Sequence, residues 1–272
     1  MRLRRKRKAD KTPLAVHAEN MTLTQHLAEL RMRLIRVLLA VVLFGVIVFA
    51  LYDPWIQSFL FHPYRVVCDA NPSFNCNGNP LLTTPLGGIT TRMKVAGWGG
   101  LILAMPVVLW QIWRFIVPGL ESKEKKYARP FLLATIALFL LGAAFAYLTL
   151  SKALQWLISY SGAATAAFTP ESYVSLVGLM MAAFGVGFLF PVLLVFLELI
   201  GVIDYKQLSG ARRYAIVAIV VVAAVITPSG DPISMLALAI PMYLFYEISV
   251  VIGWVVSRRR AKAAAKPAVG TA

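Results

Sequence analysis

Six long apolar segments constrain the fold of this chain more than any other feature. Of the 272 residues, 59% are hydrophobic and 14% are charged, and the mean hydropathy is +0.73. A soluble domain does not need so much apolar surface, whereas about 20 consecutive apolar residues form a helix that crosses a bilayer. The sequence therefore predicts an all-α, polytopic membrane protein with six transmembrane helices. The predicted spans are residues 34–52, 93–117, 129–150, 173–200, 214–227 and 233–256.

Positive charge lies almost entirely on one side of these spans. All but four of the 27 lysines and arginines fall in the N-terminal arm, in the loops after the second and fourth spans, and in the C-terminal tail. Because loops rich in Lys and Arg stay in the cytoplasm, we expect both termini to be cytoplasmic. Residues 1–20 and 257–272 are predicted to be disordered basic tails around a membrane domain of residues 21–256, the first touching anionic lipid. This distribution argues against the nucleic-acid partner that a net charge of +15 would suggest.

Three prolines and one short span define the expected shape of the bundle. Pro106, Pro191 and Pro241 fall inside the second, fourth and sixth spans, where proline removes a backbone hydrogen bond and kinks a helix. The fifth span has about 14 residues, roughly 21 Å of helix against a hydrocarbon core of about 30 Å. We therefore expect a curved bundle with short fifth and sixth helices. The fifth is either shielded by its neighbours or used to dock another membrane helix.

One acid lies just before the first span. Residues 24–34 form a predicted amphipathic helix that continues into the span and places Glu29 among Arg31, Arg33 and Arg36. Glu29 either pairs with Arg33 one turn away, worth about 0.2–0.5 kcal/mol, or receives a cationic ligand from the cytoplasm. The local pattern leaves both interpretations open.

Other candidate residues are few. Glu198 and Glu247 fall within the fourth and sixth spans, where ionisable groups are functional candidates, unless a position near the interface leaves them simply solvated. Cys68 and Cys76 share the first outer loop, where an oxidising environment favours a structural disulfide over two free thiols. The sequence has no Walker-type phosphate loop, no Cys/His cluster and no nucleophile–base pattern. We therefore expect no cofactor, no metal and no enzymatic activity.

Several short strings, taken together and in order, resemble the TatC family of twin-arginine translocase subunits. They span about residues 22–256 on the sides of the membrane predicted above. The strings are HLAELRMR at residues 26–33, WRFIVPGL at 113–120 with Glu124 following, AFGV at 183–186 ahead of Pro191, Thr227-Pro228 followed by Asp231, and AIPMY at 239–243 with Glu247.

The resemblance implies a receptor and core translocase subunit that exports folded proteins across the cytoplasmic membrane of a prokaryote, driven by the proton gradient. By resemblance, Glu29 and Glu124 accept the two arginines of a signal peptide. Arg31, Phe115 and Lys125 would frame this patch, and Pro63 and Asp231 are the matched positions on the outer side. The implied partners are the single-span proteins TatA and TatB, the signal peptides, membrane lipid and further copies of the chain.

Two positions depart from the family pattern. Leu189 stands where many relatives carry a glutamate, and Glu198 lies nine residues later, half a turn round the helix and about 13 Å nearer the cytoplasm. Met235 replaces a frequent glutamine, which weakens polar docking of a partner helix there. The alternative function is a proton-coupled small-solute transporter with Glu198 and Glu247 as relay acids. An intramembrane enzyme would need a nucleophile and a base, and no pattern supplies them.

Overall fold

The computed structural model describes residues 23–70, 85–117, 128–159 and 169–264, and within these ranges it contains helices and no strands. The prediction of an all-α fold is therefore confirmed. The chain divides into two units, residues 1–36 and 37–272, and each is described here by itself. The basic tail at residues 1–20 and the end of the chain from residue 265 lie outside the described residues.

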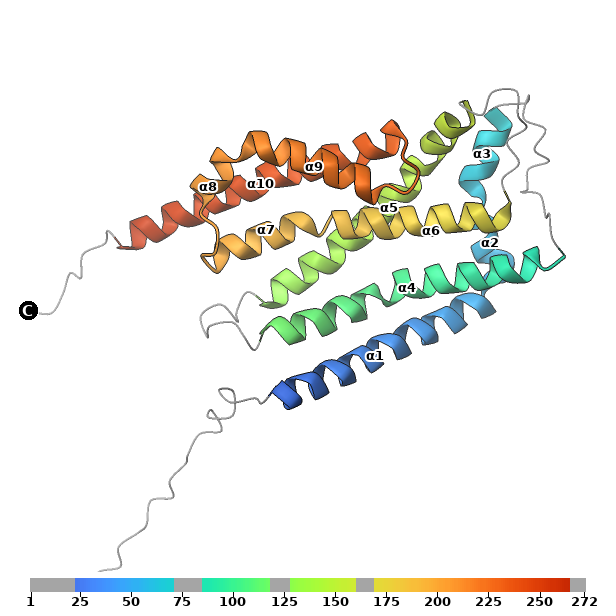
Figure 1. The fold of residues 1–272 in the computed structure, drawn as a ribbon, viewed down its shortest axis with the longest axis horizontal. Coiled ribbons are helices and arrows are strands. Elements are labelled where there is room, and N and C mark those ends of the chain that lie inside the picture. The colour runs from blue at the N-terminus through green and yellow to red at the C-terminus, as the bar shows by residue number, and fades with distance from the viewer. Residues whose placement is uncertain (1–22, 71–84, 118–127, 160–168, 265–272) are drawn as a thin grey trace, which may run out of the picture. The chain divides into compact units, whose positions relative to one another are not determined.

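Ten α-helices and one π-helical turn make up the described chain (Figure 1). The π-helical turn, Tyr52–Ile56, contains Asp53 with extended backbone angles and separates the first helix from two short ones. The α-helices are α1 (Leu23–Ala50), α2 (Gln57–Leu60), α3 (His62–Ala70), α4 (Gly87–Ile116), α5 (Ala128–Ser159), α6 (Pro170–Gly187), α7 (Phe190–Leu199), α8 (Tyr205–Gly210), α9 (Arg212–Ile226) and α10 (Pro232–Ala264).

Among the described residues, five segments are long and apolar enough to cross a membrane. They match the predicted first, second, third, fourth and sixth spans: Leu27–Ala50, Gly87–Ile116, Ala128–Ser159, Pro170–Leu199 and Pro232–Arg258. The predicted fifth span is α9, whose 15 residues cover only about 22 Å. The prediction of a short fifth helix is confirmed. The predicted short sixth helix is wrong, because α10 has 33 residues.

The long α10 also corrects the expected C-terminal tail. Its helix continues to Ala264, so residues 257–264 are helical and not disordered. Ala, Arg and Lys, which make up most of this stretch, are strong helix formers, so no residue there ends the helix. The loop after the fourth span likewise contains a helix, α8, whose first turn is capped by Asp204: its backbone N–H donates to Gln207 Oε1 at 3.1 Å.

The three span prolines act differently. Pro106 and Pro241 lie inside continuous helices, and the kinks predicted there stay a prediction. At Pro191 the predicted single span is instead broken into α6 and α7, because the ring nitrogen of proline cannot donate to a carbonyl one turn earlier. The chain bridges the break with a tight turn, in which Phe188 N–H donates to Phe184 O at 2.9 Å and Leu189 N–H donates to Val186 O at 3.0 Å.

Small residues let α5 and α6 approach closely. A Cβ atom added to Gly142 of α5 would lie 2.6 Å from Phe184 O and 3.0 Å from the Cα of Gly185 on α6. Phe139, Phe184 and Phe188 are almost completely buried around this contact. Glycines at facing positions allow helices to pack through their backbones in a membrane, where apolar side chains alone give no preference for association.

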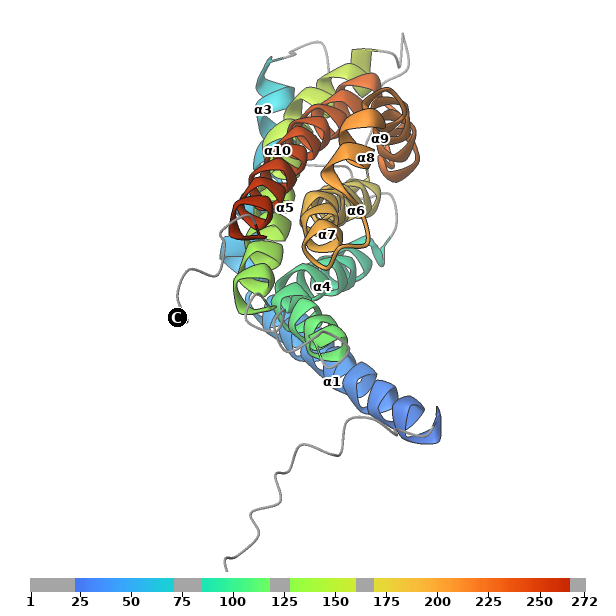
Figure 2. The same ribbon diagram turned by 90° about the vertical axis from the view of Figure 1, so that its left-hand side faces the viewer.

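Helix α10 contacts most of the helices in the second half of the chain. It packs against α5, α7 and α9, and Figure 2 shows it lying between α5 and α9. In Figure 1 the C-terminal ends of α4, α7 and α10 lie on the left side of the view, near the N-terminal end of α5. The end of the fourth span and the second half of α10 are therefore brought together at one end of residues 37–272.

Candidate functional site

Glu29 lies in the first turns of α1 and binds a guanidinium group of its own helix. Arg33, four residues later, donates from both Nε (3.2 Å) and Nη2 to Glu29 Oε1. The spacing of four residues places the two side chains on one face of the helix. The carboxylate side chain keeps 35% of its surface exposed, so the predicted pairing with Arg33 is confirmed without closing the site to a ligand.

The helix around Glu29 forms as the sequence predicted. The amphipathic segment and the first span are one continuous helix, and Leu27, Leu30 and Leu34 are exposed along it. Arg31 is exposed too. The acid is thus held on the helix that enters the membrane.

Phe115, the aromatic candidate, lies half-buried in the last turn of α4. Its neighbour Trp113 fixes that turn, because its indole N–H donates to Thr135 Oγ1 of α5 at 3.1 Å. The same indole packs edge-on against Phe196 of α7, with ring centroids 5.1 Å apart. Glu124 and Lys125 lie outside the described residues.

The candidates predicted on the outer side are structural in their contacts. Pro63 is buried in the first turn of α3, a position that tolerates proline because the first backbone N–H groups of a helix need no intrahelical acceptor. Asp231 is fully buried and caps α10: Ser234 N–H donates to its Oδ1 at 2.7 Å, and Ser229 Oγ contacts its Oδ2. Gly230 precedes it with a φ of +60°, a backbone conformation that glycine adopts readily in a tight turn. Met235 packs against the core one turn later.

One cysteine of the predicted pair can be described. Cys68 is buried in α3 and is disulfide-bonded. Cys76 lies outside the described residues, so the pairing of Cys68 with Cys76 stays a prediction.

The two acids of the predicted fourth and sixth spans have different surroundings. Glu247 accepts from Arg212 Nη2 at 2.9 Å and from Tyr243 O–H at 3.0 Å, and its side chain is 31% exposed. Glu198 is 8% exposed, and within the part of the chain that the structure describes neither of its carboxylate oxygens has a hydrogen-bond partner. The interpretation of Glu198 as a solvated interfacial residue is therefore wrong. The position of the missing glutamate, Leu189, is the half-buried residue that precedes α7.

Sequence reasoning missed an ionic cluster at the opposite end of α4. Arg92 forms an ion pair with Asp53, and its guanidinium lies over the ring of Tyr52 at 4.9 Å from the centroid. Burial raises the pKa of Tyr52, and the charge of Arg92 partly offsets this rise. The available signal was an acid directly after the first span and a basic residue at the start of the second.

These features define a class: a polytopic helical membrane protein with acidic residues near the ends of its helices. Some of these acids form ion pairs or hydrogen bonds with described residues, and Glu198 forms none with them. Comparison with known proteins then gives the family. The TatC model, described as Sec-independent protein translocase protein, matches residues 25–241. The chain belongs to the TatC family and is a subunit of the Sec-independent protein translocase.

Individual relatives agree over most of the chain. A TatC protein of Frankia casuarinae is 37% identical over 91% of this chain and 69% of its own length. Those of Deinococcus radiodurans and Aquifex aeolicus are 35% and 36% identical over 85% and 88% of this chain, and 84% and 98% of their own lengths. A crystal structure described as the twin-arginine translocase receptor TatC superposes with a TM-score of 0.67 at 35% identity, covering 85% of this chain and 99% of that one.

The family assignment does not favour the alternative of a small-solute transporter. The family assignment confirms three predictions: protein transport as the function, an all-α membrane fold and a prokaryotic origin. Glu247, one of the two acids that the transporter alternative needs as proton relays, is held by Arg212.

Proposed function

We propose that this chain is the receptor that binds twin-arginine signal peptides for the translocase, at an acidic patch formed by Glu29 and Glu124. Similarity to solved structures described as twin-arginine translocase receptors supports the proposal. The observation that carries it is the Glu29–Arg33 pair, because Glu29 already binds the chemical group that a signal-peptide arginine would present.

Exchange of one guanidinium for another is physically easy at this position. The pair joins residues four apart on one helix face, where the Glu29 side chain is 35% exposed and the Arg33 side chain is 10% exposed. Ion pairs at this spacing on a helix contribute about 0.2–0.5 kcal/mol. An arginine of a signal peptide can form two parallel hydrogen bonds to a carboxylate, a geometry that the point charge of lysine does not reproduce. Arg33 therefore pairs with Glu29 in the absence of a signal peptide, and an arginine of the signal peptide displaces it.

The remaining predicted residues have supporting roles in this proposal. Phe115 supplies an apolar wall at the end of α4, which Trp113 holds against α5 and α7. Arg31 and Lys125 frame the patch and exclude peptides that carry further positive charge at the wrong spacing. Pro63, Asp231 and Met235 stabilise the starts of α3 and α10.

The proposed setting is the cytoplasmic membrane, with both chain termini and the Glu29 patch on the cytoplasmic side. The chain assembles there with TatA, TatB and further copies of itself, as the resemblance implies. The short α9 suits docking of a single-span partner, because a helix of about 22 Å leaves part of a bilayer core of about 30 Å uncovered. The proton gradient supplies the energy, as the resemblance implies.

Export of a folded reporter tests the proposal. Cells that depend on this chain should lose most export when Glu29→Gln and Glu124→Gln are combined, because neither amide carries the charge that attracts a guanidinium. Glu171→Gln is the matched control: Glu171 accepts from Thr90 at the start of α6, far along the chain from the patch, and its loss should leave export unchanged. Full export in the double variant would contradict the proposal.

A further inference from the structure

A small polar cavity lies between the end of α7, the start of α8 and the last turns of α10. Its volume is about 170 Å³, and its polar lining comes from Glu198, Asp204, Tyr205 and Ser257. A cavity needs about 10–15 Å³ of such space to hold one water, so this cavity is large enough for several. Asp204 is exposed, so the cavity has one wall in contact with solvent.

The carboxyl group of Glu198 forms the inner wall of this cavity. It packs directly against the backbone of Gly253 on α10: a Cβ atom added there would contact Oε1 and lie 2.5 Å from Cδ and 2.6 Å from Oε2. A larger residue at position 253 would require the Glu198 carboxyl to move. Glu198 is thus accommodated by a specific feature of the neighbouring helix, although it makes no hydrogen bond to any described residue.

Among the residues that the structure describes, no positively charged side chain lines the cavity at Glu198. The titratable groups that line the cavity, Asp204 and Tyr205, supply no positive charge. From α10, Tyr246 donates its hydroxyl to Leu208 O at 2.5 Å, while the guanidinium of Arg258 stacks on Trp254, 4.3 Å from the ring centroid. On α5, Arg129 is exposed and does not line the cavity.

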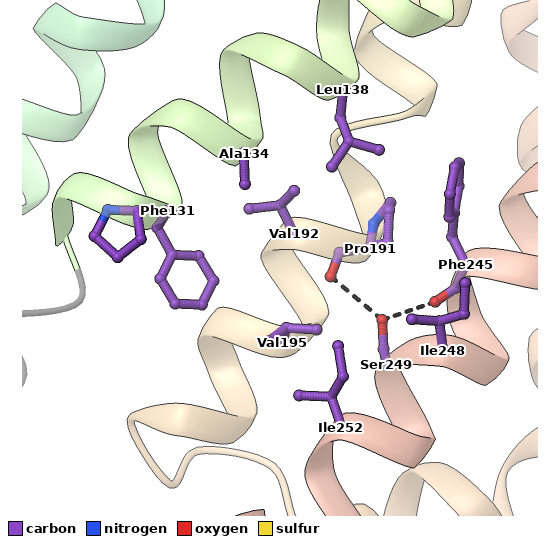
Figure 3. A pocket seen from close by; sticks show the side chains of 11 residues that line it. Phe131, Ala134, Leu138, Pro191, Val192, Val195, Phe245, Ile248, Ser249 and Ile252 are labelled. Atoms are coloured by element: carbon purple, nitrogen blue, oxygen red, sulfur yellow. Dashed lines mark hydrogen bonds between the residues drawn. The ribbon is translucent and has the colours of Figure 1, made fainter.

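A second, apolar cavity lies next to the Glu198 cavity and limits how far the polar cavity extends between α7 and α10. Figure 3 shows an apolar pocket of about 410 Å³ between α5, α7 and α10, lined by Pro191, Phe245 and Ser249 among others. Val195 and Ile252 line both cavities and so separate them. The Ser249 hydroxyl donates to Phe245 O at 2.9 Å and lies 3.4 Å from Pro191 O, so the polar atoms in this pocket are bonded.

An ionised carboxylate that is buried without a partner is far more costly than a neutral carboxylic acid. We propose that Glu198 is a proton-binding site, whose carboxylate takes up a proton from the water of the α7–α8–α10 cavity and returns it there. The reaction is a simple protonation, in which a hydronium ion of the cavity water becomes water and the carboxylate becomes a carboxylic acid. Nothing in this proposal depends on where the signal peptide binds.

Infrared difference spectroscopy tests the proposal on the purified full chain in lipid nanodiscs, labelled with ¹³C-glutamate. Between about pH 5 and about pH 9 we expect one glutamic-acid carbonyl band that is lost as the pH rises. Glu198→Gln should remove this band, and its amide is nearly isosteric, so folding should be retained. The matched control, Glu247→Gln, should keep the band, because Glu247 is paired with Arg212.

Three outcomes would overturn the proposal. One is a wild-type titration without a glutamic-acid carbonyl band, a result that needs no variant. Another is a band that persists in Glu198→Gln. The last is a band that disappears at constant pH when sodium replaces choline, because the cavity would then hold a metal cation and not a proton.

Discussion

Asp231 and Glu198 are both buried carboxylates of the same unit, and their surroundings are opposite. Asp231 receives the Ser234 N–H and contacts the Ser229 hydroxyl, at the point where α10 begins. Glu198 has no hydrogen-bond partner among the described residues and faces a small cavity near the end of α10. Burial alone therefore does not reveal what an acid does. A buried carboxylate that accepts hydrogen bonds stabilises the fold, whereas one that accepts none is available to bind a proton or another ligand.

Glu29 extends this comparison to a third case. It is partly exposed and is paired with Arg33 on its own helix, so its bond can be exchanged. The three acids form a series: fixed at Asp231, exchangeable at Glu29, and unbonded at Glu198. Each prediction below changes one member of the series.

Asp231→Asn should have the largest effect on stability. The amide oxygen of asparagine can still accept from Ser234 N–H, but the amide nitrogen that replaces Oδ2 cannot accept from the Ser229 hydroxyl. A hydrogen bond to a charged acceptor contributes about 1.5–3 kcal/mol. We expect a loss of this size in the free energy of unfolding, measured by denaturation in detergent micelles. The matched change Glu198→Gln should cost much less, and equal losses in the two variants would contradict the comparison.

Gly253→Ala should be the next most damaging change. The added methyl group would meet the Glu198 carboxyl, which is the end of a flexible side chain and can rotate away. We therefore expect a loss of stability at the low end of the about 1–3 kcal/mol that overpacking costs. Glu198→Ala in the same molecule should recover most of the lost stability, because it removes the colliding group. A double-mutant cycle gives the coupling energy, and simple additivity of the two changes would show that the two residues are not in contact.

Glu198→Leu should leave stability unchanged or raise it by about 1 kcal/mol, because an apolar group replaces a buried carboxyl that has no hydrogen-bond partner among the described residues. The same change at Glu247 should destabilise the chain slightly, because it leaves Arg212 without the carboxylate. Thermal unfolding monitored by circular dichroism distinguishes the two. A large loss in Glu198→Leu would mean that the carboxyl has a bonding role.

The sequence predicted a great deal of this fold because the apolar spans, the prolines and the short fifth helix are local features. It predicted the Glu29–Arg33 pair for the same reason, since residues four apart on a helix must be neighbours. The cavity at Glu198 depends on Gly253, 55 residues later in the chain, so only the packing of α7 on α10 reveals it. Similarly, the break at Phe188 depends on how the turn before Pro191 satisfies its backbone groups.

Arg33→Gln should have the smallest effect of the series, and it should raise the affinity for the signal peptide. It removes the guanidinium that competes with the peptide for Glu29, and the Glu29–Arg33 pair contributes only about 0.2–0.5 kcal/mol. We expect twin-arginine peptide to bind about twofold more tightly, since each 1.4 kcal/mol is tenfold in affinity. Fluorescence anisotropy with a labelled peptide measures this, and a severalfold weaker affinity would show that Arg33 orients Glu29 for binding.

The most direct test of the account is the affinity of the purified full chain for one signal peptide in two forms, with paired arginines and with paired lysines. The wild type should bind the arginine form about ten- to a hundredfold more tightly, as expected for loss of roughly 1.5–3 kcal/mol of charged hydrogen bonding. Glu29→Gln should lose most of this preference, while Glu198→Gln should retain it. Equal affinity of the wild type for both forms would contradict the account.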